Sequence, residues 1–528
     1  MSLQDFPAPE VPQLTAQIAG AAFRNGNLYM QMSDQLGTIF KNEHFGTLFS
    51  HTGQPAIAAW RLALVTVMQF AENLTDRQAA EAVRSRIDWK YALRLELEDA
   101  GFNYSVLSEF RDRLVAGKQE ALLLETLLET LKEKELWKSH DKQRTDSTHI
   151  LAAIRNLNQL ELVHETLRQA LNELAVQAPA WLKRQVSPDW FERYSERTSN
   201  YLLPDKETER QEWAEQVGQD GLFLLEQIYF GGQHPELSEL AAVETLRKVW
   251  LQNFYQEEEK VRLRQKENQP PSAMRIASPY DLEARVSSKR FITWTGYKVH
   301  LTETCAEDGP NLITNVETRP STEPDHSATG LIHERLAQKR RLPQEHFVDA
   351  GYMSVDHLVK ARQEHGIDLM GKVPEDHSWQ ARQQGYVSQD FQIDWERHTA
   401  TCPQDRVSCS WSSAVARGGY PVVKIKFRRK DCGTCVEQPS CSNNREKRRT
   451  LTLLSPQTHY EAQQTARQRQ QSPAFQQACQ VRAGVEGTIS QTAVALRMRR
   501  SRYRGREKPI YSIWPVRLRS ICCERLPG

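Results

Sequence analysis

The chain has 528 residues, 39% hydrophobic and 26% charged, so it is long enough for two or three domains with cores of their own and is not a disordered protein. No run reaches the roughly 18 apolar residues that span a bilayer. The amino terminus has neither a basic start nor an apolar stretch, so we expect a cytoplasmic protein without a signal peptide. The net charge of +2 conceals two basic segments, 421–449 with nine Lys or Arg against three acids and 494–528 with ten against two, which suit either a nucleic-acid backbone or a solvated basic face.

Residues 1–140 have the pattern of helices. The run 56–70 is largely apolar and predicts a core helix. Residues 74–83 carry a capping signal at Thr75 or Asp76, and a second amphipathic stretch follows at 105–114. Because the later stretch carries Arg111 and Arg113, the pair is open to two interpretations, a DNA reader similar to a helix-turn-helix or an all-α packing domain.

The character of the sequence changes at 142–153, where Thr and Ile recur at every second position and predict a strand. Asp146, Thr148 and Ile150 share one face of this strand. A carboxylate on the inward face of a strand is costly unless a cation lies beside it. Asp146 is therefore a candidate functional acid.

A helical, highly charged insertion is expected over 157–266, followed by a loop around Pro270 and Pro271. Strands are then predicted at 291–303 and 312–317, a helix at 328–339, and further strands before Asp349 and at 367–373. This succession of strands and helices predicts a mixed α/β sheet.

Asp349 follows the strand formers Phe347 and Val348 and precedes a break at Gly351. Ser354 is a candidate N-cap for a helix that runs towards Gly366. Asp349 would therefore stand at the carboxyl end of a strand, where open α/β sheets place their chemistry. Taken alone, an Asp in this position is as often only part of a turn.

Five of the nine cysteines lie between Cys402 and Cys441. Cys432 and Cys435 have the spacing of zinc ligands, and Cys402 or Cys409 together with Cys441 would complete a tetrahedral Zn²⁺ site. Packed, reduced thiols in a small β-rich insertion are the alternative.

Ser472 and Pro473 open a further helix, with Ser as N-cap and Pro in the first turn. At 100° per residue, one stripe of this helix collects Phe475, Cys479, Glu486, Ile489 and Ala493. Glu486 is thus expected on the core-facing side, with Arg482 one turn earlier. A purely structural Arg–Glu pair is the alternative.

Asp146, Asp349 and Glu486 are three carboxylates in compatible places. Mg²⁺ prefers oxygen ligands, and two such ions about 3.5–4 Å apart activate the attacking oxygen and stabilise the leaving oxygen in phosphodiester chemistry. The sequence contains no phosphate-binding Gly-rich motif, no HExxH and no GxSxG that would indicate other chemistry.

Eight stretches, in order, resemble the DDE transposases of bacterial insertion sequences, most closely insertion-sequence family 1182. They cover roughly residues 40–508 and lie at 74–84, 86–93, 105–114, 145–149 (Thr-Asp-Ser-Thr-His), 294–305 (Trp-Thr-Gly-Tyr-Lys-Val-His-Leu-Thr-Glu-Thr-Cys), 348–352 (Val-Asp-Ala-Gly-Tyr), 484–491 (Gly-Val-Glu-Gly-Thr-Ile-Ser-Gln) and 501–505 (Ser-Arg-Tyr-Arg-Gly).

The resemblance implies an RNase H-like core in which Asp146, Asp349 and Glu486 bind Mg²⁺ or Mn²⁺. It also implies DNA cleavage at inverted-repeat ends, attack of the freed 3′-hydroxyl on target DNA, and a homodimer on DNA. Arg482 matches an Arg four positions before the Glu in related transposases. Cys479 stands where some of them have Tyr, so a role there in handling a flipped end does not carry over. Lys298 and His300 would approach DNA or serve the strand surface.

The expected organisation follows from these elements. It comprises a helical domain expected to bind DNA (1–140), the first core strand (141–156), a helical insertion and linker (157–280), the RNase H-like core (281–375), a Cys-rich insertion (376–471), the helix carrying Glu486 (472–508) and an atypical C-terminus (509–528).

The C-terminus departs from the family pattern, because Pro509 and Pro515 forbid the continuous helix that usually follows. We hypothesise that a frameshift replaced it. Two alternatives to an active transposase therefore stay open: a catalytically compromised copy that only binds DNA, and an RNase H-like nuclease without strand transfer.

Overall fold

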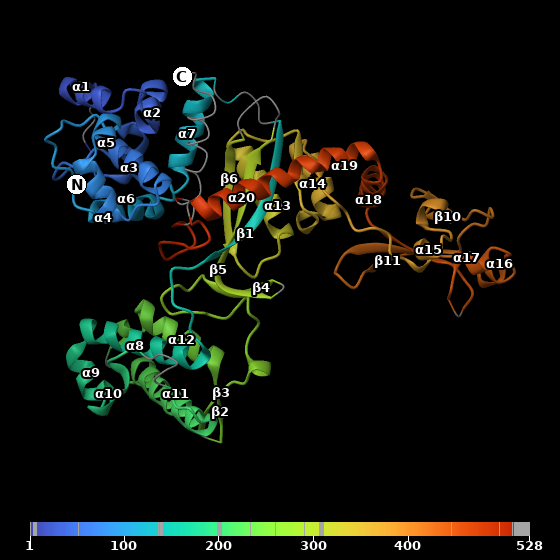
Figure 1. The fold of residues 1–528 in the computed structure, drawn as a ribbon. Coiled ribbons are helices and arrows are strands. Elements are labelled where there is room, and N and C mark those ends of the chain that lie inside the picture. Colours follow the sequence, from blue (N-terminus) through green and yellow to red (C-terminus); the bar gives the residue numbers. More distant parts are fainter. Residues whose placement is uncertain are drawn as a thin grey trace.

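The computed structural model is organised around one mixed sheet, with helices on both faces and two extended lobes (Figure 1). It describes residues 2, 3, 8–50, 52–135, 137, 141–197, 203–232, 234–258, 260–289, 291–305, 311–444, 446–495, 497–508 and 511. The expectation about the C-terminus therefore falls on residues outside this set, apart from Tyr511. Among the described helices, none combines the length and apolarity needed to cross a membrane.

The central sheet has six strands, and β1 lies in its middle. β5 and β1 are antiparallel, whereas β1, β7 and β8 run parallel to one another, and β4 and β6 pair with successive parts of the long β5. The strands are β1 (Lys142–Leu151), β4 (Arg285–Lys289), β5 (Ile292–Thr304), β6 (Ile313–Pro320), β7 (Glu345–Val348) and β8 (Asp368–Met370). The mixed α/β sheet predicted from the sequence is confirmed, although β8 is shorter than the strand expected at 367–373.

One face of the sheet packs against helices α13 (His326–Gln338) and α14 (Val355–His365), whose apolar residues meet Val348 in one core. Ser354 caps α14 as expected, because its hydroxyl accepts a hydrogen bond from the His357 amide at 3.1 Å. Gly366 ends the helix in a left-handed conformation with φ 69°. The strand, turn and helix around Asp349 thus form as the sequence predicts.

The opposite face carries the C-terminal helices. Here α20 (Gly484–Ala495) crosses the sheet, and its Val485 and Ile489 join Val299 and Leu301 of β5 in the largest core of the molecule. α19 (Pro473–Gln480) begins at Ser472, whose hydroxyl accepts from the Phe475 amide at 3.2 Å. The single helix expected over 472–508 is wrong, because a 3₁₀ turn, η6 (Val481–Ala483), separates α19 from α20.

The N-terminal helices share this core with the sheet. All residues of α3 except Arg61 and Ala71 are buried, which confirms the predicted core helix. Thr75 caps α4 in a capping box with Gln78. The helices are α1 (Gln13–Ala22), α2 (Leu28–Leu36), η1 (Asn42–Leu48), α3 (Ala59–Ala71), α4 (Asp76–Ser85), α5 (Ile87–Ala92), α6 (Ser105–Ala116) and α7 (Leu122–Glu133).

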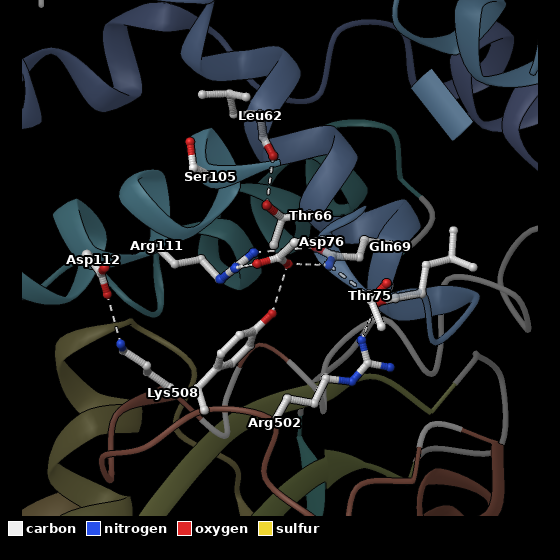
Figure 2. A network of polar contacts seen from close by, with 12 residues as sticks. Leu62, Thr66, Gln69, Thr75, Asp76, Ser105, Arg111, Asp112, Arg502 and Lys508 are labelled. Carbon is white, nitrogen blue, oxygen red and sulfur yellow. Dashed lines mark hydrogen bonds and ion pairs between the residues drawn. The ribbon is translucent and has the colours of Figure 1, made fainter. Parts of the chain in front are cut away.

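A polar network joins these helices to the segment after α20 (Figure 2). Arg111 of α6 is 1% exposed and forms an ion pair with Asp76 at 2.5 Å. Its guanidinium carbon also lies 4.5 Å from the ring centroid of Tyr503, whose hydroxyl donates to Asp76 at 3.2 Å. Arg502 donates to Leu74 O and Asn73, and Lys508 pairs with Asp112. Arg111 therefore has a structural role here, because its charge is buried against Asp76.

The helical insertion leaves the sheet after β1 and returns before β4. It has its own apolar core, which includes Trp181, Trp190 and Trp250. Its elements are α8 (Gln159–Gln177), α9 (Pro179–Gln185), α10 (Asp189–Tyr194), α11 (Glu207–Phe230), η2 (Pro235–Glu239), α12 (Ala241–Asn253), β2 (Phe254–Glu257), β3 (Lys260–Leu263) and η3 (Lys266–Asn268).

A second lobe between β8 and α19 is built from small sheets around Phe391 and Phe427. The strand β12 pairs with both β11 and β13. Its elements are α15 (Trp379–Arg382), η5 (Ser388–Asp390), β9 (Gln392–Asp394), β10 (Thr399–Thr401), β11 (Ser410–Val415), β12 (Pro421–Lys426), α16 (Arg429–Gly433), α17 (Gln438–Cys441), β13 (Thr450–Leu454) and α18 (Gln457–Gln470).

Candidate active site

Asp146 and Asp349 are neighbours because of the register between two parallel strands. The last paired residues of β1 and β7 are Thr145 and Val348, so the two acids are the next residue on each strand. Alternation along the strands places both on the sheet face that carries η6 and α20. Asp349 lies directly beyond the carboxyl end of β7, at the N-cap position of η4 (Ala350–Tyr352) but without a side-chain capping hydrogen bond.

Glu486 approaches this pair from the first turn of α20, with Arg482 between the acids. The Arg482 guanidinium contacts Asp146 Oδ2 at 3.3 Å and Glu486 Oε1 at 2.9 Å. The charge of Asp349 also acts on Arg482. Arg482 thus contacts two of the three acids, and the third lies close enough for its charge to act on the same guanidinium.

The site carries more negative charge than positive charge, with three carboxylates and one guanidinium. Burial raises the pKa of Asp146, and the nearby charges of Asp349 and Glu486 raise it further. The Ser147 amide, which donates to Asp146 Oδ1 at 2.7 Å, and Arg482 lower it without offsetting the rise. Burial lowers the pKa of Arg482, but the hydrogen bond to Glu486 and the charges of Asp146 and Asp349 raise it overall. A further cation at these carboxylates would therefore be favourable.

The stripe of apolar positions predicts that Glu486 lies on the buried side of its helix, and this prediction is wrong. Its side chain is 60% exposed, whereas Val485 and Ile489 are buried. The physical reason is the 3₁₀ turn at 481–483, which winds more tightly than an α-helix and shifts the phase of every later residue. Phe475 is buried and Cys479 half-buried on the earlier helix, in a small core with Phe347.

Two residues that sequence reasoning missed hold this arrangement in place. Arg144 and Glu303, on β1 and β5, form a buried ion pair at 2.6 Å with side-chain exposures of 7% and 0%. Arg144 also donates to Val481 O at 2.6 Å, and Thr488 of α20 donates to the other Glu303 oxygen at 2.7 Å. Two turns of the chain that flank Glu486 are thereby tied to the sheet. Arg144 lies two residues before Asp146 on the same strand, and this spacing could have indicated that both side chains lie on one face of the sheet.

Gly484, at the start of α20, permits this contact. A Cβ at this position would lie 2.0 Å from Arg144 Nη1, so only glycine leaves room for the buried guanidinium. The short distance from helix to sheet at this point is what allows Arg482 and Glu486 to meet Asp146.

Lys298 and His300 lie on the other face of β5 and serve the structure. Lys298 Nζ contacts Asp325 at 3.0 Å and donates to Glu323 O at 2.7 Å. His300 is buried and its Nδ1 lies 2.6 Å from the Tyr352 hydroxyl. Of the two interpretations, the structural one is favoured for both residues.

Comparison with known proteins gives two family matches. A transposase domain (DUF772) matches residues 20–113, and a transposase DDE domain matches residues 401–512. No curated protein and no solved structure matched the chain. The two matches support a DDE transposase of the insertion-sequence type.

The two matches cover different parts of this chain. The first spans α2 to most of α6, including the buried Arg111 and Asp76. The second contains Arg482, Glu486 and the cysteine cluster, whereas Asp146 and Asp349 lie outside it. Folding of the chain therefore brings Glu486, inside the matched region, near Asp146 and Asp349, which lie outside it.

Transposase DDE domains usually use divalent metals. The donor set of Asp146, Asp349 and Glu486 consists of carboxylate oxygens, which suits such ions. Within the described ranges, no three His, Cys, Asp or Glu side chains are already arranged to hold a metal ion. Arg482 instead supplies the positive charge among the three acids.

Four of the cysteines in the second lobe converge. Cys402, Cys432, Cys435 and Cys441 line one small cavity of about 40 Å³, whereas Cys409 is exposed elsewhere. The pKa of Cys441 is raised to about 11, mainly by burial and also by the neighbouring thiols, against the opposing charge of Arg449. Thiol sulfur suits Zn²⁺ chemically, but the thiols are not set in a metal-ligand arrangement.

Proposed function

We propose that this transposase cleaves DNA at the ends of an insertion sequence and joins the freed 3′-hydroxyl to target DNA, with Mg²⁺ or Mn²⁺. We further propose that its core is RNase H-like. Five strands of the sheet lie in the order β6, β5, β1, β7, β8. Numbered along the chain from one to five, this order is 3-2-1-4-5. The first three are antiparallel and the last two run parallel to the first, which supports this assignment.

The single observation that carries the proposal is the meeting of Asp146, Asp349 and Glu486 around Arg482. The three carboxylates would hold the divalent ions. Bound there, such ions stabilise the attacking and leaving oxygens of a phosphodiester. Arg482 acts as the internal counter-ion of the site before metal and DNA arrive, and remains beside the acids to contact a phosphate.

The remaining parts follow from the same assignment. The transposase would act as a homodimer on its terminal inverted repeats, in the cytoplasm, and would fall within insertion-sequence family 1182. For the second lobe we propose that Cys402, Cys432, Cys435 and Cys441 close around a structural Zn²⁺. Elemental analysis of the purified protein tests this, and a protein free of zinc would leave packed thiols as the explanation.

The decisive experiment uses DNA that carries the element's own end, identified from the inverted repeats that flank the gene. We expect Mg²⁺-dependent nicking by the wild type and a loss of at least 100-fold in the Asp349→Ala variant. The control variant is Glu396→Ala, which removes an exposed acid of the second lobe. Equal nicking by wild type and Asp349→Ala would remove the catalytic assignment and leave a protein that only binds DNA.

Strand transfer separates a transposase from a nuclease. A precut end with a free 3′-hydroxyl is incubated with supercoiled plasmid and Mg²⁺. Joined product supports transposition, whereas nicking without joined product would favour the RNase H-like nuclease.

A further inference from the structure

A pocket rich in arginine lies where the helical insertion meets the central sheet. Its volume is about 450 Å³, and Arg155, Arg197, Arg500 and Arg504 line it. All four are exposed residues, so their charges are accessible to a ligand, and Arg155 also lies 3.6 Å from Glu161. Among the described residues that line the pocket, Glu165 is the only carboxylate, and it is paired with Arg168 at 3.2 Å and with the Tyr280 hydroxyl at 2.7 Å. The lining therefore carries a net positive charge.

The pocket is held in a fixed shape by backbone contacts. The segment after α20 runs beside the end of β1, with Leu151 N donating to Arg499 O at 2.8 Å and Ser501 N donating to Leu151 O at 2.9 Å. These bonds set the position of Arg500. The same segment is fixed again at Gly505, whose amide donates to Asp281 at 3.2 Å.

Arg504 is oriented in addition by an aromatic ring. Its guanidinium carbon lies 5.0 Å from the ring centroid of Tyr280, while the Tyr280 hydroxyl is engaged by Glu165 and Arg168. A guanidinium stacked on an aromatic face keeps its donors directed sideways, towards a ligand in the pocket. Two separate elements, the insertion and the C-terminal segment, thus present arginines to one space.

We propose that this pocket binds the sugar–phosphate backbone of the DNA substrate at a distance from the cleavage site. Arginine forks match phosphate oxygens, and the open junction of two lobes admits a continuous chain. The pocket begins at Leu151, five residues along β1 from Asp146, which is roughly 17 Å at the rise of a strand. For a duplex lying along β1 this corresponds to about five nucleotides, at 3.4 Å per nucleotide of each strand. The placement relative to cleavage rests on the proposed function, whereas the binding itself does not.

The first test measures binding without divalent metal, so that catalysis plays no part. The probe is a fluorescein-labelled 30-base-pair duplex of mixed sequence, and its dissociation constant is measured between 50 and 200 mM KCl. We expect Arg500→Gln/Arg504→Gln to weaken binding roughly tenfold and to reduce the salt slope by about two, one unit for each lost phosphate contact.

The matched control is Lys183→Gln/Arg184→Gln, which removes the same charge from exposed residues at the end of α9, outside the pocket. Equal losses in the two double variants would overturn the proposal, because they would reflect net charge and not a site. Thermal unfolding of both variants is compared with the wild type, and rescue of binding by Arg500→Lys/Arg504→Lys separates lost charge from a disturbed fold.

The second test locates the contact on DNA that carries the element's end. Single phosphates are replaced by neutral methylphosphonates along each strand. In the wild type we expect one region of weakened binding about five nucleotides from the cleavage position, and no further weakening at that region in Arg500→Gln/Arg504→Gln. Unchanged interference in the double variant would refute the pocket assignment. If Asp349→Ala loses nicking but keeps the methylphosphonate interference, both the catalytic assignment and the DNA-binding pocket are supported. If the wild type shows the interference but does not nick DNA, only the catalytic assignment is removed.

Discussion

At the scale of single residues, the site is governed by charge that is only partly compensated. Asp146 has a side chain that is 20% exposed, lies among two other carboxylates and has one guanidinium to balance them. Its pKa is raised in the folded state, mainly by burial. The folded protein therefore binds this proton more tightly than the unfolded chain does, and the ionised form makes the fold less stable.

Replacing Asp146 with Asn is expected to raise the melting temperature at pH 7 in the absence of divalent metal. The sign follows from the raised pKa: stability is lost as pH rises from the unfolded value of 3.8 through the folded one, and Asn does not ionise. Differential scanning fluorimetry measures the shift. Addition of Mg²⁺ should stabilise the wild type and not the variant, and an equal Mg²⁺ response in both would contradict a role of Asp146 in metal binding.

Glu303→Gln is expected to destabilise the protein by about 3–5 kcal/mol, because it leaves the buried Arg144 without its counter-charge. Urea unfolding measures the free energy. Glu323→Gln is the control, since Glu323 pairs with Arg319 in a more exposed ion pair and should cost less than about 1 kcal/mol. Similar losses in the two variants would show that the buried pair does not fix α20 on the sheet.

At the scale of elements, the segment after α20 connects the N-terminal helices to the sheet. Arg111 and Asp76 belong to α6 and α4, and Tyr503 and Arg502 come from the far end of the chain (Figure 2). The sheet, α20 and the N-terminal helices share one apolar core. The position of the helix with Glu486 is therefore coupled to the N-terminal lobe.

Asp76→Asn is expected to lower the free energy of unfolding by about 3–5 kcal/mol, because Arg111 would keep a buried, uncompensated charge. The pair Lys508–Asp112 joins the same two parts of the chain at the surface, and Asp112→Asn should cost at most about 1 kcal/mol. Chemical denaturation of both variants checks this. An equal, small effect would mean that the apolar core alone holds the two parts together.

Sequence reasoning predicted elements better than it predicted their packing. The strand with Asp146, the strand end at Asp349 and the caps at Ser354 and Ser472 depend on local propensity and on side chains a few residues away, so they could be read from spacing. The break at 481–483 could not, because it coincides with a contact between Val481 O and Arg144, more than 300 residues earlier. The buried role of Arg111 was hidden for the same reason.

At the scale of the whole molecule, a short chain of buried polar groups connects the sheet to α13, on the sheet face opposite η6 and α20. Thr145 Oγ1 lies 2.7 Å from His346 Nε2, and His346 Nδ1 lies 2.9 Å from His333 Nε2. Burial lowers the pKa of His346 to about 3 and that of His333 to about 2, the latter with a contribution from neighbouring histidines. Both imidazoles are therefore neutral in the folded protein at any physiological pH.

Global stability should consequently fall as the solution becomes more acidic than about pH 6.5. The unfolded chain takes up protons at its histidines with a pKa of 6.5, whereas folded His346 and His333 take them up only near pH 3 and 2, so stability is full above pH 6.5 and is lost below it. Each histidine adds a slope of up to about 1.4 kcal/mol per pH unit. Denaturant unfolding at pH 7, 6 and 5 measures this, and His333→Asn/His346→Asn should flatten the dependence. A slope unchanged in the double variant would assign the acid sensitivity to other groups.

The way the helical insertion is attached has a consequence for protein engineering. Leu151 and Arg285 both pair with Gly296, one on each side of β5, so the chain departs and returns only two strand spacings apart, roughly 10 Å. A linker of a few residues would bridge that gap. The insertion is thus a separable unit, which can be excised or exchanged for another module while the strand order of the sheet is kept.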